Sequence, residues 1–359
     1  MSGRRPQRVA LVIGQLTRGG AEGQLAQLVR GLDRARFAPF VYCLSARTEP
    51  VGGELVAAGV PLRVLVGSGL TRSRELARHF DADAIDLVHS WLYLGNAMAG
   101  AAHLWRPSRP LITSARNCKI QGRISRLANV LAFRASRAIV ANSRDVAAYI
   151  MRVYAAPSAG IRVIYNGIDV ERFRPDTAEE AMRRSIVTIG RLVDQKNHDL
   201  FLRAAAALSR EVADRRFVIV GDGPLRGALE RQAAQLGLAE RVTFTGERDD
   251  VETILRSASL FWLTSRWEGM PNVVLEAMAS GVPVLATDVG GARELVRDGV
   301  DGFVVTPDDA TAFVRHSLQL LRDAATWRHF SLAARRHAES FSTAKMNEAM
   351  AQLYDEVSQ

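Results

Sequence analysis

The sequence alternates short apolar segments with amphipathic stretches of helical spacing, and this alternation occurs twice. Seven strand-like segments lie in the first half, at residues 8–14, 39–44, 62–66, 85–89, 110–114, 138–142 and 162–165. Six more lie in the second half, at residues 185–189, 217–220, 242–245, 260–264, 283–286 and 302–305. Strands that alternate with helices form parallel sheets covered on both faces. The pattern therefore predicts an α/β fold.

The alternation pauses at residues 166–184, where the sequence NGIDVERFRPDTAEEAMRR is rich in turn formers and then in charge. A chain of 359 residues is also about twice the usual length of one domain. We expect two Rossmann-like, doubly wound domains facing a central cleft, at residues 1–168 and 185–343, joined by a linker at 169–184. Ligands of such sheets bind beyond the carboxyl ends of the strands, so the loops after the strands are the candidate sites.

The net charge of +9 is unevenly divided along the chain. Residues 1–175 hold 25 Lys and Arg against 11 Asp and Glu, whereas the remainder is mildly acidic. A basic half suggests an anionic partner, such as a lipid surface, a phosphorylated substrate or nucleic acid. A solvated, arginine-rich surface is the alternative.

Two cysteines, Cys43 and Cys118, are too few for a disulfide framework or a four-ligand zinc site. The arginines and apolar run near the N-terminus imitate a signal peptide, but the run at 9–13 is short, and we interpret it as a buried strand. No segment approaches the roughly 18 apolar residues of a transmembrane helix. We therefore expect a cytoplasmic protein that does not span the membrane.

Glycines follow the first strand at Gly19 and Gly20, just before a helical stretch. Such a turn lets backbone amides approach an anion at the start of a helix. A dinucleotide site would also need the full G-x-G-x-x-G pattern and an acidic residue near the end of the second strand. The second strand instead ends in Tyr-Cys-Leu-Ser, at 42–45, which disfavours a nicotinamide-dependent enzyme.

The second half begins with a strand that ends at Gly190 and is followed by Arg191 and Lys196. Two cations at the end of a strand suit a diphosphate, because arginine can bind two oxygens and lysine supplies a point charge. Ordinary surface solvation is the other interpretation.

The stretch SRWEGMPNVVLE, at residues 265–276, places Glu268 and Glu276 on either side of a predicted helix start. Pro271 suits the first position of this helix, which we expect to end near Ser280, before Gly281. Amides at the helix start favour a phosphate, and Glu276 lies about one turn further along. A nucleotide-sugar fits this layout. Alternatively, Glu268 caps the helix and Glu276 faces water.

The ordered motifs GGAE, NGID, GRLVDQKNHDLFLRA, VGDGPLR and SRWEGMPNVVLEAMASGVPVLATDVGGARELV resemble the family-4, retaining glycosyltransferases of the GT-B fold. The resemblance covers nearly the whole chain and is strongest over residues 166–296. It implies transfer of a hexose or N-acetylhexosamine from a nucleotide-sugar, with UDP expected, to a glycan or lipid-linked acceptor in polysaccharide, lipopolysaccharide or glycolipid biosynthesis. It also implies that the last helix, at 344–359, packs back on the first domain.

The resemblance further implies a role for each matching residue. Glu276 is expected to hold the ribose hydroxyls and Glu268 the transferred sugar. Residues at the helix start are expected to assist them: Gly269, Met270, Pro271 and Asn272. Arg191 and Lys196, which follow Gly190, are expected to neutralise the diphosphate and to stabilise charge on the leaving phosphate.

Other implied roles concern the base and the first domain. The segment from Arg248 to Val251 is expected to receive the base, and Gly19 and Gly20 to lie against the donor phosphate or the acceptor. The family reaction is expected to need no covalent intermediate, no metal ion and no cofactor.

One position departs from the family pattern. Many relatives carry a histidine after the fifth strand, where this sequence has Arg116 followed by Asn117, as in a subset of the family. Arg116 and His89, which ends the fourth strand, are the candidate replacements, although a packed histidine is an equally good interpretation of His89. Asp81 and Asp83 imitate a metal-binding motif, but they precede a strand, at the wrong end of the sheet, and we expect no metal there.

The stretch 119–137 mixes arginines with apolar residues at helical spacing. A basic amphipathic helix can lie on anionic lipid, so peripheral membrane contact is one expectation, and an ordinary helix covering the sheet is the other. A nucleotide-sugar epimerase and a noncatalytic sugar-nucleotide binder are the alternative functions. We expect no nucleic-acid partner, because the basic half lacks interleaved aromatic residues for stacking.

Overall fold

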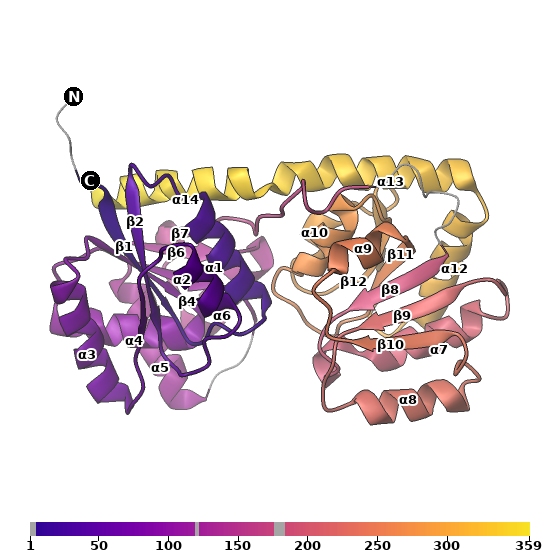
Figure 1. Cartoon of the computed structure of the whole chain (residues 1–359), viewed down its shortest axis with the longest axis horizontal. Coiled ribbons are helices and arrows are strands. Elements are labelled where there is room, and N and C mark those ends of the chain that lie inside the picture. The colour runs from indigo at the N-terminus through magenta and orange to yellow at the C-terminus, as the bar shows by residue number, and fades with distance from the viewer. Residues whose placement is uncertain (1–4, 119–121, 176–183) are drawn as a thin grey trace. The chain divides into compact units, whose positions relative to one another are not determined.

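The computed structural model describes residues 5–118, 122–175 and 184–359 (Figure 1). The chain divides into two compact units, which are residues 1–167 together with 343–359 (unit 1) and residues 168–342 (unit 2). Residues 176–183, which make up half of the predicted linker, lie outside the described residues. Each unit contains its own sheet and its own hydrophobic core.

Unit 1 is built on a seven-stranded parallel sheet in the order β3-β2-β1-β4-β5-β6-β7. Its strands are β1 (Gln7–Ile13), β2 (Phe37–Cys43), β3 (Leu62–Val64), β4 (Leu87–Trp91), β5 (Leu111–Ala115), β6 (Ala138–Ala141) and β7 (Ile161–Val163). Its helices are α1 (Gly20–Gly31), α2 (Val51–Ala57), α3 (Gly69–Ala82), α4 (Leu92–Trp105), α5 (Arg123–Ala135), α6 (Arg144–Tyr154) and α14 (Thr343–Ser358).

Unit 2 repeats this plan with a six-stranded parallel sheet in the order β10-β9-β8-β11-β12-β13. Its strands are β8 (Ser185–Ile189), β9 (Arg216–Val220), β10 (Val242–Gly246), β11 (Ala258–Leu263), β12 (Val284–Thr287) and β13 (Gly302–Val305). Its helices are α7 (His198–Leu208), α8 (Arg226–Gln235), α9 (Val251–Arg256), α10 (Asn272–Ala279), α11 (Ala292–Leu295), α12 (Ala310–Leu321) and α13 (Ala324–Ala338).

The predicted α/β class and its parallel sheets are confirmed, and no predicted strand end differs from the observed one by more than two residues. The agreement has a physical reason, because strands covered on both faces are continuous apolar runs. In β1, for example, the last five residues are all buried.

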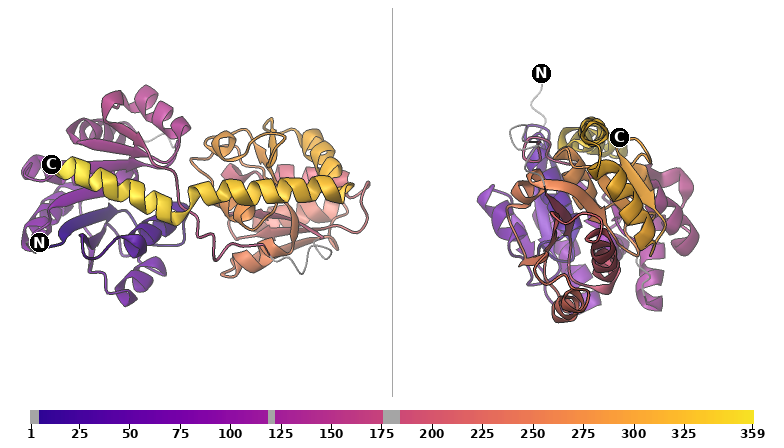
Figure 2. Two further views of the ribbon diagram at one scale, coloured as in Figure 1. Left: turned by 90° about the horizontal axis from the view of Figure 1, so that it is seen from above. Right: turned by 90° about the vertical axis from the view of Figure 1, so that its right-hand side faces the viewer.

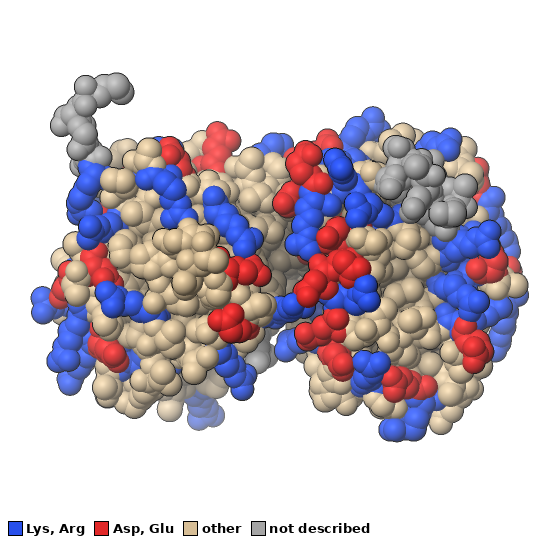
Figure 3. Space-filling view, viewed as in Figure 1, with Lys and Arg blue, Asp and Glu red and all other residues tan. Residues whose placement is uncertain are grey.

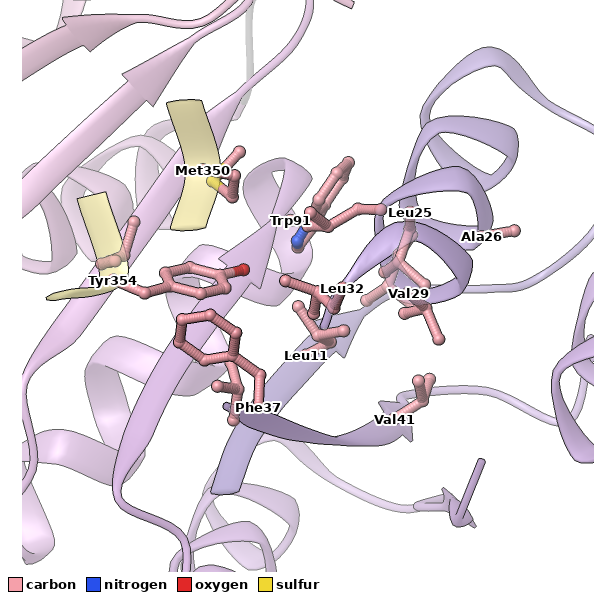
Figure 4. Packing of buried hydrophobic residues seen from close by; sticks show 14 of the residues in the cluster. Leu11, Leu25, Ala26, Val29, Leu32, Phe37, Val41, Trp91, Met350 and Tyr354 are labelled. Atoms are coloured by element: carbon pink, nitrogen blue, oxygen red, sulfur yellow. The ribbon is translucent and has the colours of Figure 1, made fainter. Parts of the chain in front are cut away.

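The helix at the end of the chain, α14, belongs to the core of unit 1. It packs on α1 and is drawn in yellow in Figures 1 and 2. Tyr354 of α14 is fully buried, and its ring meets that of Phe37 edge to face with centroids 5.6 Å apart. Figure 4 shows both rings among Leu11, Trp91 and Met350. Residues from both ends of the chain therefore fill one core.

Each sheet has a point where the strand order reverses. In unit 1 it lies between β1 and β4, and in unit 2 it lies between β8 and β11. Loops that leave neighbouring strands in opposite directions open a crevice at this point, beyond the carboxyl ends of the strands. Within the described ranges, no helix combines the length and the apolar character needed to cross a bilayer.

Candidate functional site

Four predicted site residues of unit 2 lie at the point where the strand order of its sheet reverses. Gly190, Arg191 and Lys196 follow β8, and Glu268 follows β11. These two strands pair directly in the sheet. The parallel topology therefore brings together two loops that are far apart in the sequence.

Lys196 and Glu268 form an ion pair, with 2.6 Å between Lys196 Nζ and Glu268 Oε1. The hydroxyl of Ser265 donates to the same oxygen at 2.7 Å. Glu268 is only 8% exposed. The carboxylate is therefore held by the loop after β8, and it does not cap α10, which removes one of the two interpretations that the sequence allowed.

The turn that carries Glu268 is supported from behind by the loop after β12. Gly290 has a φ of +53°, and a Cβ there would lie 2.4 Å from the carbonyl oxygen of Glu268. Gly291 donates its N–H to the carbonyl of Gly269 at 2.6 Å. Glycine is needed at 290 both for the left-handed backbone and for the close approach.

Helix α10 begins at Asn272, so Pro271 precedes the first helical residue instead of occupying it as predicted. Pro271 has an extended backbone, with φ −76° and ψ 102°. Pro271, the N-cap residue, makes no side-chain capping hydrogen bond to this helix. The positive end of its dipole thus lies next to Glu268, Gly269 and the buried Met270.

Glu276 lies four positions after the start of α10, which is about 6 Å along the axis. Its carboxyl is partly exposed, and burial raises its pKa from 4.5 to about 7. Arg172 and Lys196 act in the opposite direction, while Glu252 adds to the rise in pKa. Glu276 is thus close to several charged groups and is not a simple water-facing side chain.

Arg191 is exposed, and within the described part of the chain its side chain has no hydrogen-bond or ion-pair partner. Lys196 crosses in front of Gly190, where a Cβ would lie 3.1 Å from Lys196 Cδ. The absence of a side chain at 190 therefore lets the lysine reach Glu268.

The predicted base-binding segment lies at the start of α9. The guanidinium of Arg248 binds both oxygens of Asp250 at 2.7 Å, and Val251 is the first helical residue. Arg172 pairs with Glu252 at 2.8 Å and donates to the carbonyl of Asp249 at 3.0 Å. This segment is therefore fixed by two arginines.

In unit 1, Gly19 precedes α1 and Gly20 is its first residue. A Cβ on Gly19 would lie 2.2 Å from a carboxylate oxygen of Glu22, which is itself buried. A buried carboxylate at the helix start repels a phosphate and favours hydroxyl groups. The start of this helix is therefore occupied by a carboxylate, and the contact of Gly19 and Gly20 with the donor phosphate or the acceptor stays a prediction.

His89 is a packed side chain of β4. It has no exposed surface; its Nδ1 lies 2.8 Å from the hydroxyl of Tyr354, and its Nε2 lies 2.7 Å from the hydroxyl of Ser114. Burial and the nearby Arg116 hold the pKa of His89 well below its usual value. Of the two interpretations of His89, the structure favours the packed histidine over the catalytic one, because both nitrogens are occupied and neither meets solvent.

Arg116 follows β5 and is buried, with 6% exposure. Its Nη1 donates to Asn166 Oδ1 at 2.8 Å, and its guanidinium carbon lies 3.7 Å from the centre of the Trp91 ring.

The aspartates that imitate a metal motif are engaged in ion pairs. Asp81 pairs with Arg109 at 2.5 Å, and Asp83 binds Arg63 and accepts a hydrogen bond from Tyr42 at 2.7 Å. Among the described residues, no group of three or more His, Cys, Asp or Glu side chains is placed to hold a metal ion.

Sequence reasoning missed three residues that contact or adjoin the predicted site residues. Ser265 donates to the carboxylate of Glu268, Arg172 holds the segment that was predicted to receive the base, and the 44% exposed Trp267 adjoins Glu268. The carbonyl of Trp267 accepts a hydrogen bond from the side chain of Gln195 at 2.9 Å, which fixes the backbone that presents the indole. A large aromatic residue beside the motif glutamate was the available signal for Trp267.

The two doubly wound parallel units define the GT-B class of fold, and solved structures of this class agree. The chain resembles Anabaena Alr3699/HepE in complex with UDP, with a TM-score of 0.87 and 22% identity over 98% of this chain and 100% of that one. It also resembles WaaG, a glycosyltransferase involved in lipopolysaccharide biosynthesis, with a TM-score of 0.73 and 18% identity over 96% and 99% of the two chains. At these identities the likeness establishes the fold.

Family models identify the sequence more closely. Residues 18–172 match the model described as Glycosyltransferase Family 4, and residues 183–323 match the model described as Glycosyl transferases group 1. The chain therefore belongs to the group 1, family-4 glycosyltransferases, as the resemblance in its motifs predicted.

Curated relatives align with about half of the chain. Over 201 residues it is 34% identical to the UDP-Gal:alpha-D-GlcNAc-diphosphoundecaprenol alpha-1,3-galactosyltransferase of Escherichia coli, covering 52% of each chain. Over 209 residues it is 34% identical to the GDP-mannose-dependent alpha-(1-6)-phosphatidylinositol monomannoside mannosyltransferase of Mycolicibacterium smegmatis, covering 51% of this chain and 55% of that one. The chain thus spans about half the length of these relatives.

Proposed function

We propose that the chain transfers a hexose or N-acetylhexosamine from a nucleotide-sugar to a glycan or lipid-linked acceptor, with retention of configuration. One observation carries the proposal: Glu268 and Glu276 lie on either side of the uncapped N-terminus of α10, and Lys196 is paired to Glu268. A diphosphate at the start of α10 has one carboxylate available for each of the sugars attached to it.

The helix start and two cations supply the electrostatics of this proposal. The N-terminus of α10 and the unpaired Arg191 attract the diphosphate. Glu276 accepts hydrogen bonds from the ribose hydroxyls, and Glu268 accepts them from the transferred sugar. The segment at Arg248–Val251 is the proposed binding site of the base.

The reaction forms a bond between the acceptor oxygen and the anomeric carbon while the bond from that carbon to the β-phosphate oxygen breaks. The proton of the acceptor hydroxyl passes to the departing diphosphate, so atoms and charge balance. Arg191 and Lys196 stabilise the charge that grows on the leaving phosphate, and this electrostatic term is the largest one that such a site supplies. In this scheme the two cations neutralise the diphosphate in place of a metal ion, and no cofactor takes part.

UDP is the proposed nucleotide. Solved structures of the same fold contain UDP or UDP-glucose, and the galactosyltransferase relative is named for UDP-Gal, whereas the mannosyltransferase relative is named for GDP-mannose. A lipid-linked acceptor is favoured by both relatives, whose names contain diphosphoundecaprenol and phosphatidylinositol.

We also propose peripheral contact with an anionic membrane through α5. Three apolar residues on one face of this helix are exposed, namely Ile124 at 88%, Leu127 at 62% and Leu131 at 49%, with Arg123 and Arg126 beside them. This combination suits the interface of an anionic bilayer. On the face drawn in Figure 3, Lys and Arg are interspersed with Asp and Glu. A cytoplasmic location fits this proposal, and nucleic acid is not a proposed partner.

Two experiments test these proposals. Purified protein is incubated with UDP- and GDP-sugars, and thermal unfolding, nucleotide release and the configuration of the product by NMR are recorded. Slow hydrolysis that first forms the α anomer of the sugar, or transfer to an added acceptor that gives an α-linked product, supports the proposal. Isomerisation without an acceptor would identify an epimerase, and binding without turnover would identify a noncatalytic binder.

Flotation with anionic liposomes at low salt tests the contact through α5. A Leu127→Glu variant should lose the flotation, whereas Val56→Glu, at an exposed residue of α2, should retain it.

A further inference from the structure

Arg116 is a buried cation without a counter-ion. Burial leaves 6% of the residue exposed. Within the described part of the chain no carboxylate pairs with it, and Asn166 supplies its only side-chain hydrogen bond. Its neighbours are neutral, because Trp91 is an indole and burial keeps the imidazole of His89 uncharged.

Two donors of Arg116 are unused. Its Nε and Nη2 are buried, and neither has a hydrogen-bond partner among the residues that the structure describes. Arginine is almost never fully buried unless it is paired, since an uncompensated charge loses its hydration without a replacement. Burial lowers the pKa of Arg116 to about 9, which leaves the group charged at neutral pH. The fold thus keeps a positive charge and two N–H groups that its own side chains do not satisfy.

We propose that Arg116 is the receptor for an anionic group, a phosphate or a carboxylate, on the acceptor substrate. The inference rests on the proposed function, because it takes unit 1 as the acceptor unit. Nε and Nη2 form one edge of the guanidinium fork and match two oxygens of such a group. Arg116 directly follows β5, at the carboxyl end of the sheet, where doubly wound domains bind ligands. Neither donor is exposed, so the anion has to displace neighbouring side chains as it enters.

The first test uses stability alone, in a buffer without phosphate, sulfate or carboxylate. Arg116→Met removes the uncompensated charge at similar volume and should raise the unfolding midpoint, by on the order of 5 °C. Arg126→Met, on the exposed surface of α5, is the matched control and should change it little. A lower midpoint for Arg116→Met would mean that the arginine is structural, and it would overturn the proposal.

The second test titrates inorganic phosphate and acetate into the whole chain saturated with UDP. The wild type should gain stability with at least one of them, and the stronger one identifies the class of the anion. Arg116→Met should weaken this binding roughly 10- to 100-fold, and Arg116→Lys should restore part of it. An unchanged titration would refute the assignment.

The affinity for UDP distinguishes the two substrates. Arg116→Met should bind UDP as tightly as the wild type. A loss of UDP affinity as large as the loss of phosphate affinity would assign the anion to the donor and overturn the proposal. These binding measurements need no turnover, so they can fail while sugar transfer succeeds, and the reverse also holds.

Discussion

Lys196 and Glu268 come from loops after two neighbouring strands, and their side chains meet at 2.6 Å. Glu268 is 8% exposed and Lys196 19%, so the pair is largely shielded from water. The carboxylate proposed to hold the sugar is therefore bound to a cation proposed to meet the diphosphate. In the proposed function, this pair links the group that binds the sugar to a group that binds the diphosphate.

Removal of Lys196 should affect both stability and turnover. Lys196→Met leaves the carboxylate of Glu268 without its cation, and we expect a loss of about 1–3 kcal/mol in the free energy of unfolding, less than for a fully buried pair because the lysine is partly exposed. Denaturant titration measures it. Arg203→Met breaks the exposed pair with Asp199 and should change stability by at most about 0.5 kcal/mol. Equal effects of the two variants would contradict the shielding of the first pair.

Substitution of Glu268 and of Glu276 should affect different steps, which are turnover and nucleotide binding. Glu276→Ala should weaken nucleotide binding, because the ribose loses its acceptor. Glu268→Ala should lower kcat more than it weakens nucleotide binding, by on the order of 100-fold, because it removes contacts to the reacting sugar. Calorimetry with UDP and steady-state kinetics separate the two effects. The reverse pattern would show that their roles are exchanged.

The raised pKa of Glu276 predicts a specific dependence of stability on pH. Because its pKa rises from 4.5 to about 7 on folding, the folded state binds more protons between these values. The contribution of Glu276 is therefore fully present below about pH 4.5 and is lost as the pH rises to about 7. Relative to the wild type, Glu276→Gln should become more stable across this window, by at most about 3 kcal/mol. A difference in stability that is constant with pH would rule out the raised pKa.

Substitution of Gly290 even by alanine, which adds only a methyl group, should disturb the turn that carries Glu268. Gly290→Ala forces a Cβ to 2.4 Å from the carbonyl of Glu268 and should both destabilise the fold and displace this glutamate. Gly299→Ala is the matched control, because Gly299 has a φ of +73° with open space around its Cβ position. The control should lose only about 1–2 kcal/mol in the free energy of unfolding, which is the cost of a left-handed backbone at a residue with a Cβ, and it should keep its turnover. Equal kcat values for the two variants would remove the role of Gly290 in supporting the turn.

The strands of both sheets could be predicted because the sequence of a buried parallel strand is an uninterrupted apolar run bounded by turn residues. The proximity of the loops after β8 and β11 could be predicted as well, because their glycines, cations and glutamates stand at recognisable spacings, while the binding of a donor there stays a proposal. The start of α10 was one residue off, since a proline suits both the residue before a helix and its first position.

The pairing of side chains could not be predicted in the same way. Lys196 and Glu268 are separated by 72 residues, and only the order of the strands brings them together. The burial of His89 depends on Tyr354, from the far end of the chain. Equally, the burial of Glu22 against Gly19 depends on the packing around this helix start, which the sequence does not specify.

The central claim is that Glu268 and Glu276 frame a nucleotide-sugar whose sugar is transferred. The most direct measurement follows nucleotide release and the anomeric configuration of the product by NMR, with a panel of UDP- and GDP-sugars. The account predicts that at least one donor raises the unfolding midpoint and releases nucleotide together with a sugar that first appears as the α anomer. It also predicts that Glu268→Ala slows the release by on the order of 100-fold while nucleotide still binds. A chain that no nucleotide-sugar stabilises, and that releases no nucleotide, would contradict it.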